Sequence, residues 1–140
     1  MKLLTKNTDY AVRALVKIAQ RAGEPVPASL IAKEERIPYA YLRRLLNDLR
    51  DRKVLRSTEG KGGGFVLGRK PEEIFLTDVM EVFQGEVNLT ECMFRQKICH
   101  NRSTCVLRHK IREIEKKVLG DLEGISIGTL LNETKGQKND

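Results

Sequence analysis

Three cysteines lie close together in the second half of the chain, where they could bind a metal. Cys92, Cys99 and Cys105 are the only cysteines among 140 residues, and they form a C-x6-C-x5-C pattern. An odd number of cysteines argues against a disulfide framework, and the short paired spacing typical of structural zinc sites is absent. Three widely spaced thiolates on one loop can hold an iron–sulfur cluster. Zinc binding, redox-active thiols and simply buried thiols remain alternative interpretations of this spacing.

A cluster held by three cysteines needs a fourth ligand, and four side chains are of a suitable type. Glu91, His100 and His109 lie near the cysteines in the sequence, and Asp9 could reach a cluster from the partner chain of a dimer. Cys105 lies near the start of a predicted helix, where the helix dipole favours a thiolate. The residues alone leave the choice of fourth ligand open.

Basic side chains in the first half of the chain form a second group with evident chemistry. Arg43 and Arg44 lie off the apolar stripe of a predicted helix, so both face outward. From a helix in the major groove an arginine fork can bind guanine, and either arginine can bind phosphate. The other candidate DNA contacts are two tyrosines at the start of this helix, a serine and an arginine that suit phosphate, and the turn of a predicted hairpin: Tyr39, Tyr41, Ser29, Arg56, Lys61 and Gly62.

The charge of the chain is divided unevenly between its halves. The formal net charge is +7; residues 1–70 carry 16 Lys and Arg against 7 Asp and Glu, or +9, and residues 71–140 carry 10 against 12, or −2. A folded basic half is typical of a protein that binds a polyanion. Trp is absent and aromatic residues make up only 5%, which argues against a stacking surface for single strands. Double-stranded DNA is therefore the expected partner.

The spacing of apolar residues predicts three helices in the first 50 residues. A helix is expected over 9–20, capped by Thr8 or Asp9, and a shorter one over 30–35, which Ser29 would precede. A third helix begins after Pro38, which suits the first helical position, and it carries leucines at i, i+3, i+4 and i+7. A short second helix followed by a basic third helix is the pattern of a helix-turn-helix.

Two short strands follow and complete a winged helix-turn-helix. Residues 54–57 and 65–67 read as strands on either side of a glycine-rich turn at 60–64, and a helix is expected over 77–83. The hairpin would form a wing beside the third helix. The expected fold is mainly α with this small β wing, and it makes residues 1–85 the DNA-binding domain.

A long helix is predicted in the last third of the chain. It would be capped by Ser103 or Thr104 and run to about Gly124, with apolar residues at heptad spacing: Leu107, Ile111, Ile114 and Val118. A helix outside the compact domain must bury such a seam, and a second copy of itself is the simplest partner. A two-fold homodimer also matches the two half-sites of a pseudo-palindromic operator. Residues 86–105 would then form a cluster-binding loop, and residues 103–134 the dimerisation helix with a C-terminal helix.

Other classes of protein fit the sequence poorly. No apolar run approaches the length of a membrane span, and the N-terminus is too polar for a signal peptide, so a cytoplasmic location is expected. The glycine run at 60–64 lacks the Lys-Ser/Thr ending of a phosphate loop, and no Ser-His-Asp pattern is present. We therefore expect a binding protein and not an enzyme.

These features together resemble the Rrf-two family of winged-helix repressors, which includes an iron–sulfur (IscR) branch and a nitric-oxide-sensing (NsrR) branch. The resemblance covers nearly the whole chain. It rests on the start of the DNA-binding domain (residues 1–85, called the reader domain below), on the start of its third helix, on the wing and on the cysteines: Leu4-Thr5, Thr8-Asp9-Tyr10-Ala11, Ile37-Pro38 with Tyr41-Leu42, residues 60–67, and Cys92, Cys99 and Cys105.

The resemblance implies a homodimer whose DNA affinity changes when a bound cluster is lost or altered. It places Cys92, Cys99 and Cys105 on the ligand cysteines of the family. Asp9 falls where the nitric-oxide-sensing branch supplies a carboxylate ligand from the partner subunit, which favours a four-iron cluster (4Fe-4S) over a two-iron one (2Fe-2S).

Several positions depart from the family pattern. In the IscR branch a histidine ligand stands three residues after the last cysteine, whereas here Arg108 holds that place and His109 follows it. One residue on a helix is a rotation of ~100°, so the ligand role does not transfer directly to His109. Glu59 replaces a common wing arginine, for which Lys61 can substitute, and Arg43 replaces an acidic residue. The operator sequence is therefore expected to differ.

The sequence predicts a homodimeric transcriptional regulator, a repressor, whose DNA affinity is controlled by an iron–sulfur cluster held by three cysteines and sensitive to redox change or nitric oxide. The alternative is a winged-helix regulator whose cysteines bind zinc or respond to oxidation without a cluster.

Overall fold

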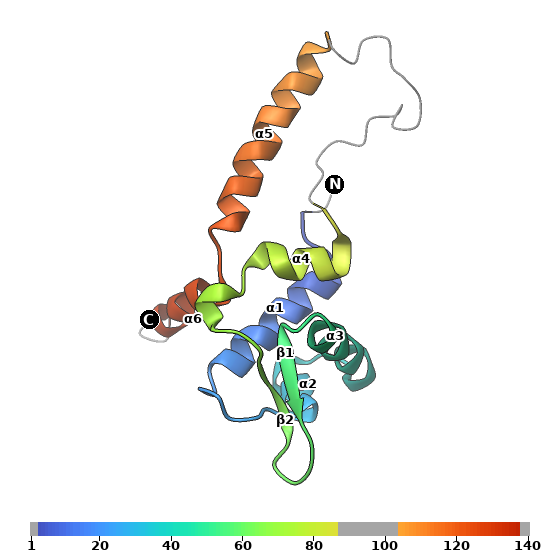
Figure 1. Cartoon of the computed structure of the whole chain (residues 1–140), viewed down its shortest axis with the longest axis vertical. Coiled ribbons are helices and arrows are strands. Elements are labelled where there is room, and N and C mark those ends of the chain that lie inside the picture. Colours follow the sequence, from blue (N-terminus) through green and yellow to red (C-terminus); the bar gives the residue numbers. More distant parts are fainter. Residues whose placement is uncertain (1–2, 87–103, 138–140) are drawn as a thin grey trace.

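The computed structural model describes residues 3–86 and 104–137, which form helices and one small antiparallel sheet (Figure 1). In chain order the elements are α1 (Lys6–Ala19), α2 (Ala28–Glu35), α3 (Tyr39–Asp51), β1 (Leu55–Thr58), β2 (Gly64–Leu67), the 3-10 turn η1 (Pro71–Glu73), α4 (Leu76–Gln84), α5 (Val106–Glu123) and α6 (Ile127–Gln137). The fold class predicted from the sequence, mainly helical with a small β wing, is confirmed.

Helices α1, α2 and α3 pack around one apolar core. α3 buries the leucine stripe that the sequence predicted, Leu42, Leu45, Leu46 and Leu49. Each fully buried leucine contributes about 1.5–3 kcal/mol of transfer free energy. α2 ends at Arg36, whose φ of 56° turns the chain sharply into α3. α2, this tight turn and α3 together form the helix-turn-helix.

The wing is anchored to the loop before α2. β1 and β2 pair with Leu55 opposite Leu67, and Phe65 exchanges backbone hydrogen bonds of 2.9 and 3.0 Å with Val26. A Cβ atom added to Gly64 would lie 2.5 Å from the carbonyl carbon of Val26. Glycine is thus required where β2 crosses the chain before α2, and this crossing fixes the wing relative to the helix-turn-helix.

The last two helices take different paths. α6 returns to the body and packs on α1 and η1, with Ile127 fully buried. α5 extends away from the body (Figure 1) and contacts it near its C-terminal end, where Leu122 packs with Leu76 and Met80. Within the part of the chain that the structure describes, no helix is long and apolar enough to cross a membrane.

Three helices begin at other residues than the sequence predicted. Thr5 caps α1, because its hydroxyl accepts the N–H of Thr8 at 3.3 Å, and Thr8 is instead buried in the first turn. α2 starts at Ala28, so Ser29 lies inside it. The residue before α5 is Cys105, and not Ser103 or Thr104. In α1 the burial of Thr8 leaves Thr5 to cap the helix, and in α2 the extended backbone of Pro27 directly precedes the first helical residue.

Candidate functional site

The outward face of α3 begins with a hydrogen-bonded pair. Nη1 of Arg43 donates to the hydroxyl of Tyr39 at 3.0 Å, and both side chains are exposed. The first turn of α3 holds no acidic residue, and its N-terminal end carries the positive end of the helix dipole. This end of the helix is therefore suited to face a polyanion.

Arg44 occupies a different environment although it follows Arg43 directly. Its guanidinium carbon lies 5.6 Å from the ring centroid of Tyr41. Tyr41 is half-buried, its ring meets that of Tyr10 edge-on at 5.8 Å, and its hydroxyl donates to Oδ1 of Asn7 on α1. Tyr41 thus joins α3 to α1, while Arg44 keeps an exposed cation over the ring.

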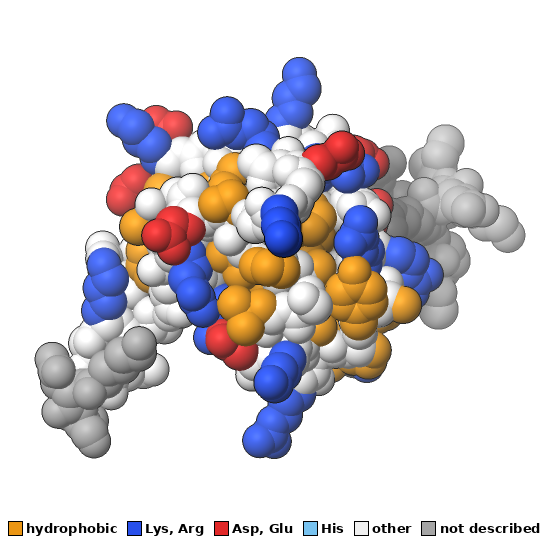
Figure 2. All heavy atoms as spheres, turned by 90° about the horizontal axis from the view of Figure 1, so that it is seen from below, with side chains coloured by type: hydrophobic (Ala, Val, Ile, Leu, Met, Phe, Trp, Pro, Cys, Tyr) orange, Lys and Arg blue, Asp and Glu red, His pale blue; other side chains and the backbone are white. Residues whose placement is uncertain are grey.

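The remaining candidate DNA contacts lie on neighbouring exposed segments. Ser29 on α2, Arg56 on β1 and Lys61 in the turn of the wing are all exposed, and Gly62 has a φ of 79° that the turn requires. Neither Arg56 nor Lys61 forms an ion pair within residues 3–86 and 104–137. Figure 2 looks at the molecule from below, from the side of the hairpin, and shows several Lys and Arg side chains spread over this face among apolar side chains and a few acidic ones. The structure therefore leaves these cations available to phosphates.

Two cations, Lys17 on α1 and Arg21 just after it, form ion pairs with the end of α2. Lys17 lies 2.8 Å from Glu34 and 3.6 Å from Glu35, and Arg21 lies 3.7 Å from Glu34. The hydrogen bond from Lys17 holds the pKa of Glu34 below its ordinary value and raises the pKa of Lys17. The two carboxylates of α2 are thus neutralised on the α1 side.

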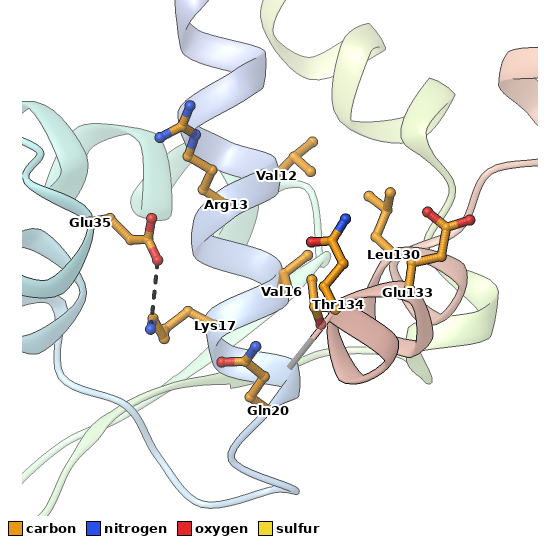
Figure 3. A pocket seen from close by; sticks show the side chains of 10 residues that line it. Val12, Arg13, Val16, Lys17, Gln20, Glu35, Leu130, Glu133 and Thr134 are labelled. Atoms are coloured by element: carbon orange, nitrogen blue, oxygen red, sulfur yellow. Dashed lines mark ion pairs between the residues drawn. The ribbon is translucent and has the colours of Figure 1, made fainter. Parts of the chain in front are cut away.

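The same face of α1 borders a groove against α6 (Figure 3). The groove has a volume of about 380 Å³ and is lined by Val12, Val16 and Leu130 together with polar side chains. Figure 3 also shows the Lys17–Glu35 pair beside it.

Only one of the predicted cysteine ligands lies among the described residues. Cys92, Cys99 and the candidate ligands Glu91 and His100 fall outside them. Cys105 is a free, half-buried thiol directly before α5, and its carbonyl accepts the N–H of His109 at 3.2 Å. The structure thus brings Cys105 and His109 to one end of α5, one helical turn apart.

Asp9 lies on α1, at a distance from Cys105 within the chain. Its Oδ2 atom pairs with Nε of Arg13 at 3.1 Å, and its side chain is about half exposed (46%). α5 has 18 residues and so spans about 27 Å, and Cys105 precedes the end of α5 that points away from α1 (Figure 1). No three metal-ligating side chains gather within the described ranges.

A contact that the sequence did not indicate joins α4 to α1. Oε1 of Gln84 accepts the N–H of Thr5 at 3.1 Å and the hydroxyl of Thr8 at 2.7 Å, and Nε2 donates to the carbonyl of Leu3 at 2.8 Å. We call this set the Gln84 clasp. A glutamine at the end of a helix has no pattern that reveals such contacts in advance.

A buried three-helix core, an outward basic third helix and an anchored wing define the class of the protein. It is a winged helix-turn-helix of the DNA-binding type.

Comparison with known proteins identifies the family. The family model Rrf2, described as "Iron-dependent Transcriptional regulator", matches residues 4–133. The chain is 33% identical over 139 residues to the HTH-type transcriptional regulator IscR of Aliivibrio salmonicida. The match covers 99% of this chain and 82% of that protein. IscR of Photorhabdus laumondii is 32% identical over 130 residues, 92% of this chain and 79% of that one. The chain belongs to the Rrf2 family of transcriptional regulators, as its sequence resemblance indicated.

Solved structures share the same fold. CymR, the global cysteine regulator of B. subtilis, superposes with a TM-score of 0.82 at 21% identity, over 95% of this chain and 98% of CymR. IscR of T. potens superposes with a TM-score of 0.75 at 24% identity, over 96% and 88% of the two chains.

Proposed function

We propose that the protein is a homodimeric repressor whose affinity for duplex DNA is controlled by an iron–sulfur cluster held by Cys92, Cys99 and Cys105. The observation that carries the proposal is the place of the cysteine segment. It joins α4, which packs on α1, to α5, an exposed helix with an apolar seam. The family description "Iron-dependent" and the IscR relatives support this choice.

The exposed seam of α5 supports a homodimer. Val106 and Leu107 are 71% and 70% exposed and Ile114 is 50% exposed, whereas Val118 packs against the body. An exposed apolar stripe on a helix is typical of a protein–protein interface, because burying it removes apolar surface from water. A second copy of α5 offers the same apolar surface. If two copies of α5 cross antiparallel about a two-fold axis, the start of one helix lies beside the body of the other protomer.

That arrangement would complete the ligand set between two chains. Cys105 lies before the start of α5, and Asp9 lies on the body, so the partner's Asp9 is the carboxylate that could reach the cysteines. Asp9 can use its second oxygen or leave Arg13 to do so. His109, one turn from Cys105, is the other candidate. The position of Asp9 is the reason that we favour a four-iron cluster over a two-iron one.

The chain's own contacts provide a route from the cysteine segment to the reader helix. The Gln84 clasp joins the end of α4, from which the segment departs, to the first turn of α1. Asn7 on that turn holds the hydroxyl of Tyr41 on α3. A movement of the segment would therefore shift α1 and α3 together and change how two recognition helices fit their half-sites. Residues 1–85, 86–105 and 103–134 would serve as reader, sensor and dimerisation segments.

Anaerobic purification tests the proposal. We expect bound iron and sulfide, visible absorbance, and a change in affinity for a pseudo-palindromic duplex when the cluster is removed. Replacing Cys92 with Ala should abolish both the absorbance and the difference in affinity, and Asp9→Ala should alter the absorbance spectrum. Protein with one zinc per chain and no sulfide would overturn the cluster and support the zinc alternative; reversible oxidation without bound metal would support thiol sensing.

A further inference from the structure

The first two turns of α3 carry two adjacent arginines with different partners. Arg43 donates to the hydroxyl of Tyr39, while Arg44 lies over the ring of Tyr41. Consecutive residues on a helix are separated by ~100°, so the two guanidinium groups leave α3 in different directions. This difference indicates that the two arginines have different roles. The inference rests on the DNA interface proposed above.

Arg43 retains most of its hydrogen-bonding capacity. A guanidinium group has five N–H donors in one plane, and the bond to Tyr39 uses Nη1 alone. Within residues 3–86 and 104–137 no carboxylate pairs with Arg43, whereas Arg50 on the same helix lies 3.6 Å from Asp51 and Arg13 lies 3.1 Å from Asp9. The fork of Arg43 is therefore available to a ligand in front of α3.

The hydroxyl of Tyr39 limits the orientations of that fork. Tyrosine has only two side-chain torsions, and Tyr39 lies one helical turn before Arg43. The hydrogen bond selects among the many rotamers of arginine before any ligand arrives. A pre-ordered side chain loses less conformational entropy on binding. The saving is larger for a contact that requires one orientation, such as a bidentate hydrogen bond, than for a contact that requires only a charge.

We propose that Tyr39 is a positioning residue for Arg43 and that Arg43 so held reads a guanine in each half-site, while Arg44 adds sequence-independent affinity. The N-terminal residues of a recognition helix are those that reach base edges, and a planar fork matches O6 and N7 of guanine. Arg44 is drawn toward α1 through Tyr41, whose hydroxyl is held by Asn7. That position suits a phosphate at the edge of the groove.

The test measures sequence preference separately from general affinity. Full-length wild type and variants are used to select from a library of randomised duplexes, and binding to an unrelated duplex is measured alongside. Tyr39→Phe should reduce the preference for guanine at one symmetric pair of positions by about three- to tenfold, the effect of one hydrogen bond, and should affect binding to the unrelated duplex less than this preference. Arg43→Lys keeps the charge but loses the fork, and it should reduce the same preference by about tenfold or more.

The double variant and Arg44→Ala complete the test. Combining Tyr39→Phe with Arg43→Lys should give no further loss, because the hydroxyl acts through the fork. Arg44→Ala should weaken binding to all duplexes alike. Uniform weakening by Tyr39→Phe would show a direct phosphate contact and overturn the positioning role, as would no change at all. If wild type shows no salt-dependent duplex binding, the DNA interface itself fails, a result distinct from either.

Discussion

At the scale of single residues, the choice of glycine at one position of the wing is set by a close approach between two backbone segments. Gly64 lies where β2 crosses Val26, and the space for a side chain is taken by main-chain atoms. The glycine-rich turn was evident from the sequence, but which glycine is sterically required was not. That distinction depends on the pairing of Phe65 with Val26, two segments far apart in the chain.

Gly64→Ala should lower the free energy of unfolding by about 2–3 kcal/mol, because overpacking against a fixed backbone forces the crossing apart. Gly62→Ala is the matched control. Its Cβ would meet no atom within 4 Å, and only the positive φ would cost about 1 kcal/mol. Urea unfolding measures both. Equal losses for the two variants would contradict the importance of the crossing.

The Lys17–Glu34 pair predicts a specific pH dependence of stability. The pKa of Glu34 is lowered, first by the hydrogen bond from Lys17, so its stabilising effect is present above the ordinary value of 4.5 and disappears as pH falls through the lowered pKa. The raised pKa of Lys17 maintains the pair up to pH values above 10.5. Glu34→Gln should therefore lower Tm at pH 7, and the two proteins should converge in acid.

Glu24→Gln removes an exposed carboxylate that forms no ion pair within the described ranges, and serves as the control. Thermal unfolding followed between pH 3 and pH 9 gives the comparison. A difference between wild type and Glu34→Gln that persists unchanged below the lowered pKa would rule out the ion pair as its cause.

At the scale of elements, periodicity predicted every helix of the reader domain, and long-range contacts decided how the helices connect. The leucine stripe of α3 is a local pattern and was predicted correctly, as was the presence of the long helix α5. The starts of α1 and α2 were misplaced because Thr8 is required in the core beside Gln84, and because Pro27 precedes α2. Such choices depend on residues more than 70 positions away or on backbone geometry.

The Gln84 clasp should contribute to stability. Gln84→Leu would leave the hydroxyl of fully buried Thr8 without its 2.7 Å acceptor, and we expect a loss of about 1–3 kcal/mol. Gln84→Glu keeps the acceptor for buried Thr8 but turns a carboxylate oxygen toward the carbonyl of Leu3. Because Leu3 is exposed and water can separate these two oxygens, the effect of Gln84→Glu should be smaller. Denaturant unfolding compares the two. A larger loss in Gln84→Glu would indicate that the donor to Leu3 is the important contact.

The seam of α5 should determine the oligomeric state. Ile114→Glu places a charge in the middle of the proposed dimer interface, and light scattering should give a mass near that of one 15.9 kDa chain. Ile114 is 50% exposed in the single chain, so helix content by circular dichroism should be retained. Lys116→Glu, on the other side of α5, should leave the dimer intact. A dimer that survives Ile114→Glu would place the interface elsewhere.

At the scale of the whole molecule, the basic charge is concentrated in the reader domain. Residues 1–70 carry +9 and the remainder −2, and several of the cations sit on α3 and the wing. The sequence predicted this uneven distribution of charge, and the apolar periodicity of the helices predicted the fold. It could not show that Arg43 and Arg44 have separate partners, because this depends on the packing of Tyr41 against Tyr10 and Asn7.

The placement of charge, and not its total, should set the salt dependence of DNA binding. If the wing cations contact phosphates, replacing Arg56 and Lys61 with Ala removes four contacts per dimer. The slope of log affinity against log salt should then become shallower by about 3.6, or 0.9 for each contact. Replacing Lys116 and Lys117 with Ala changes the net charge equally on α5, away from the wing, and should leave the slope unchanged. Fluorescence anisotropy between 50 and 200 mM salt measures both, and equal changes in slope would mean that net charge alone attracts the duplex.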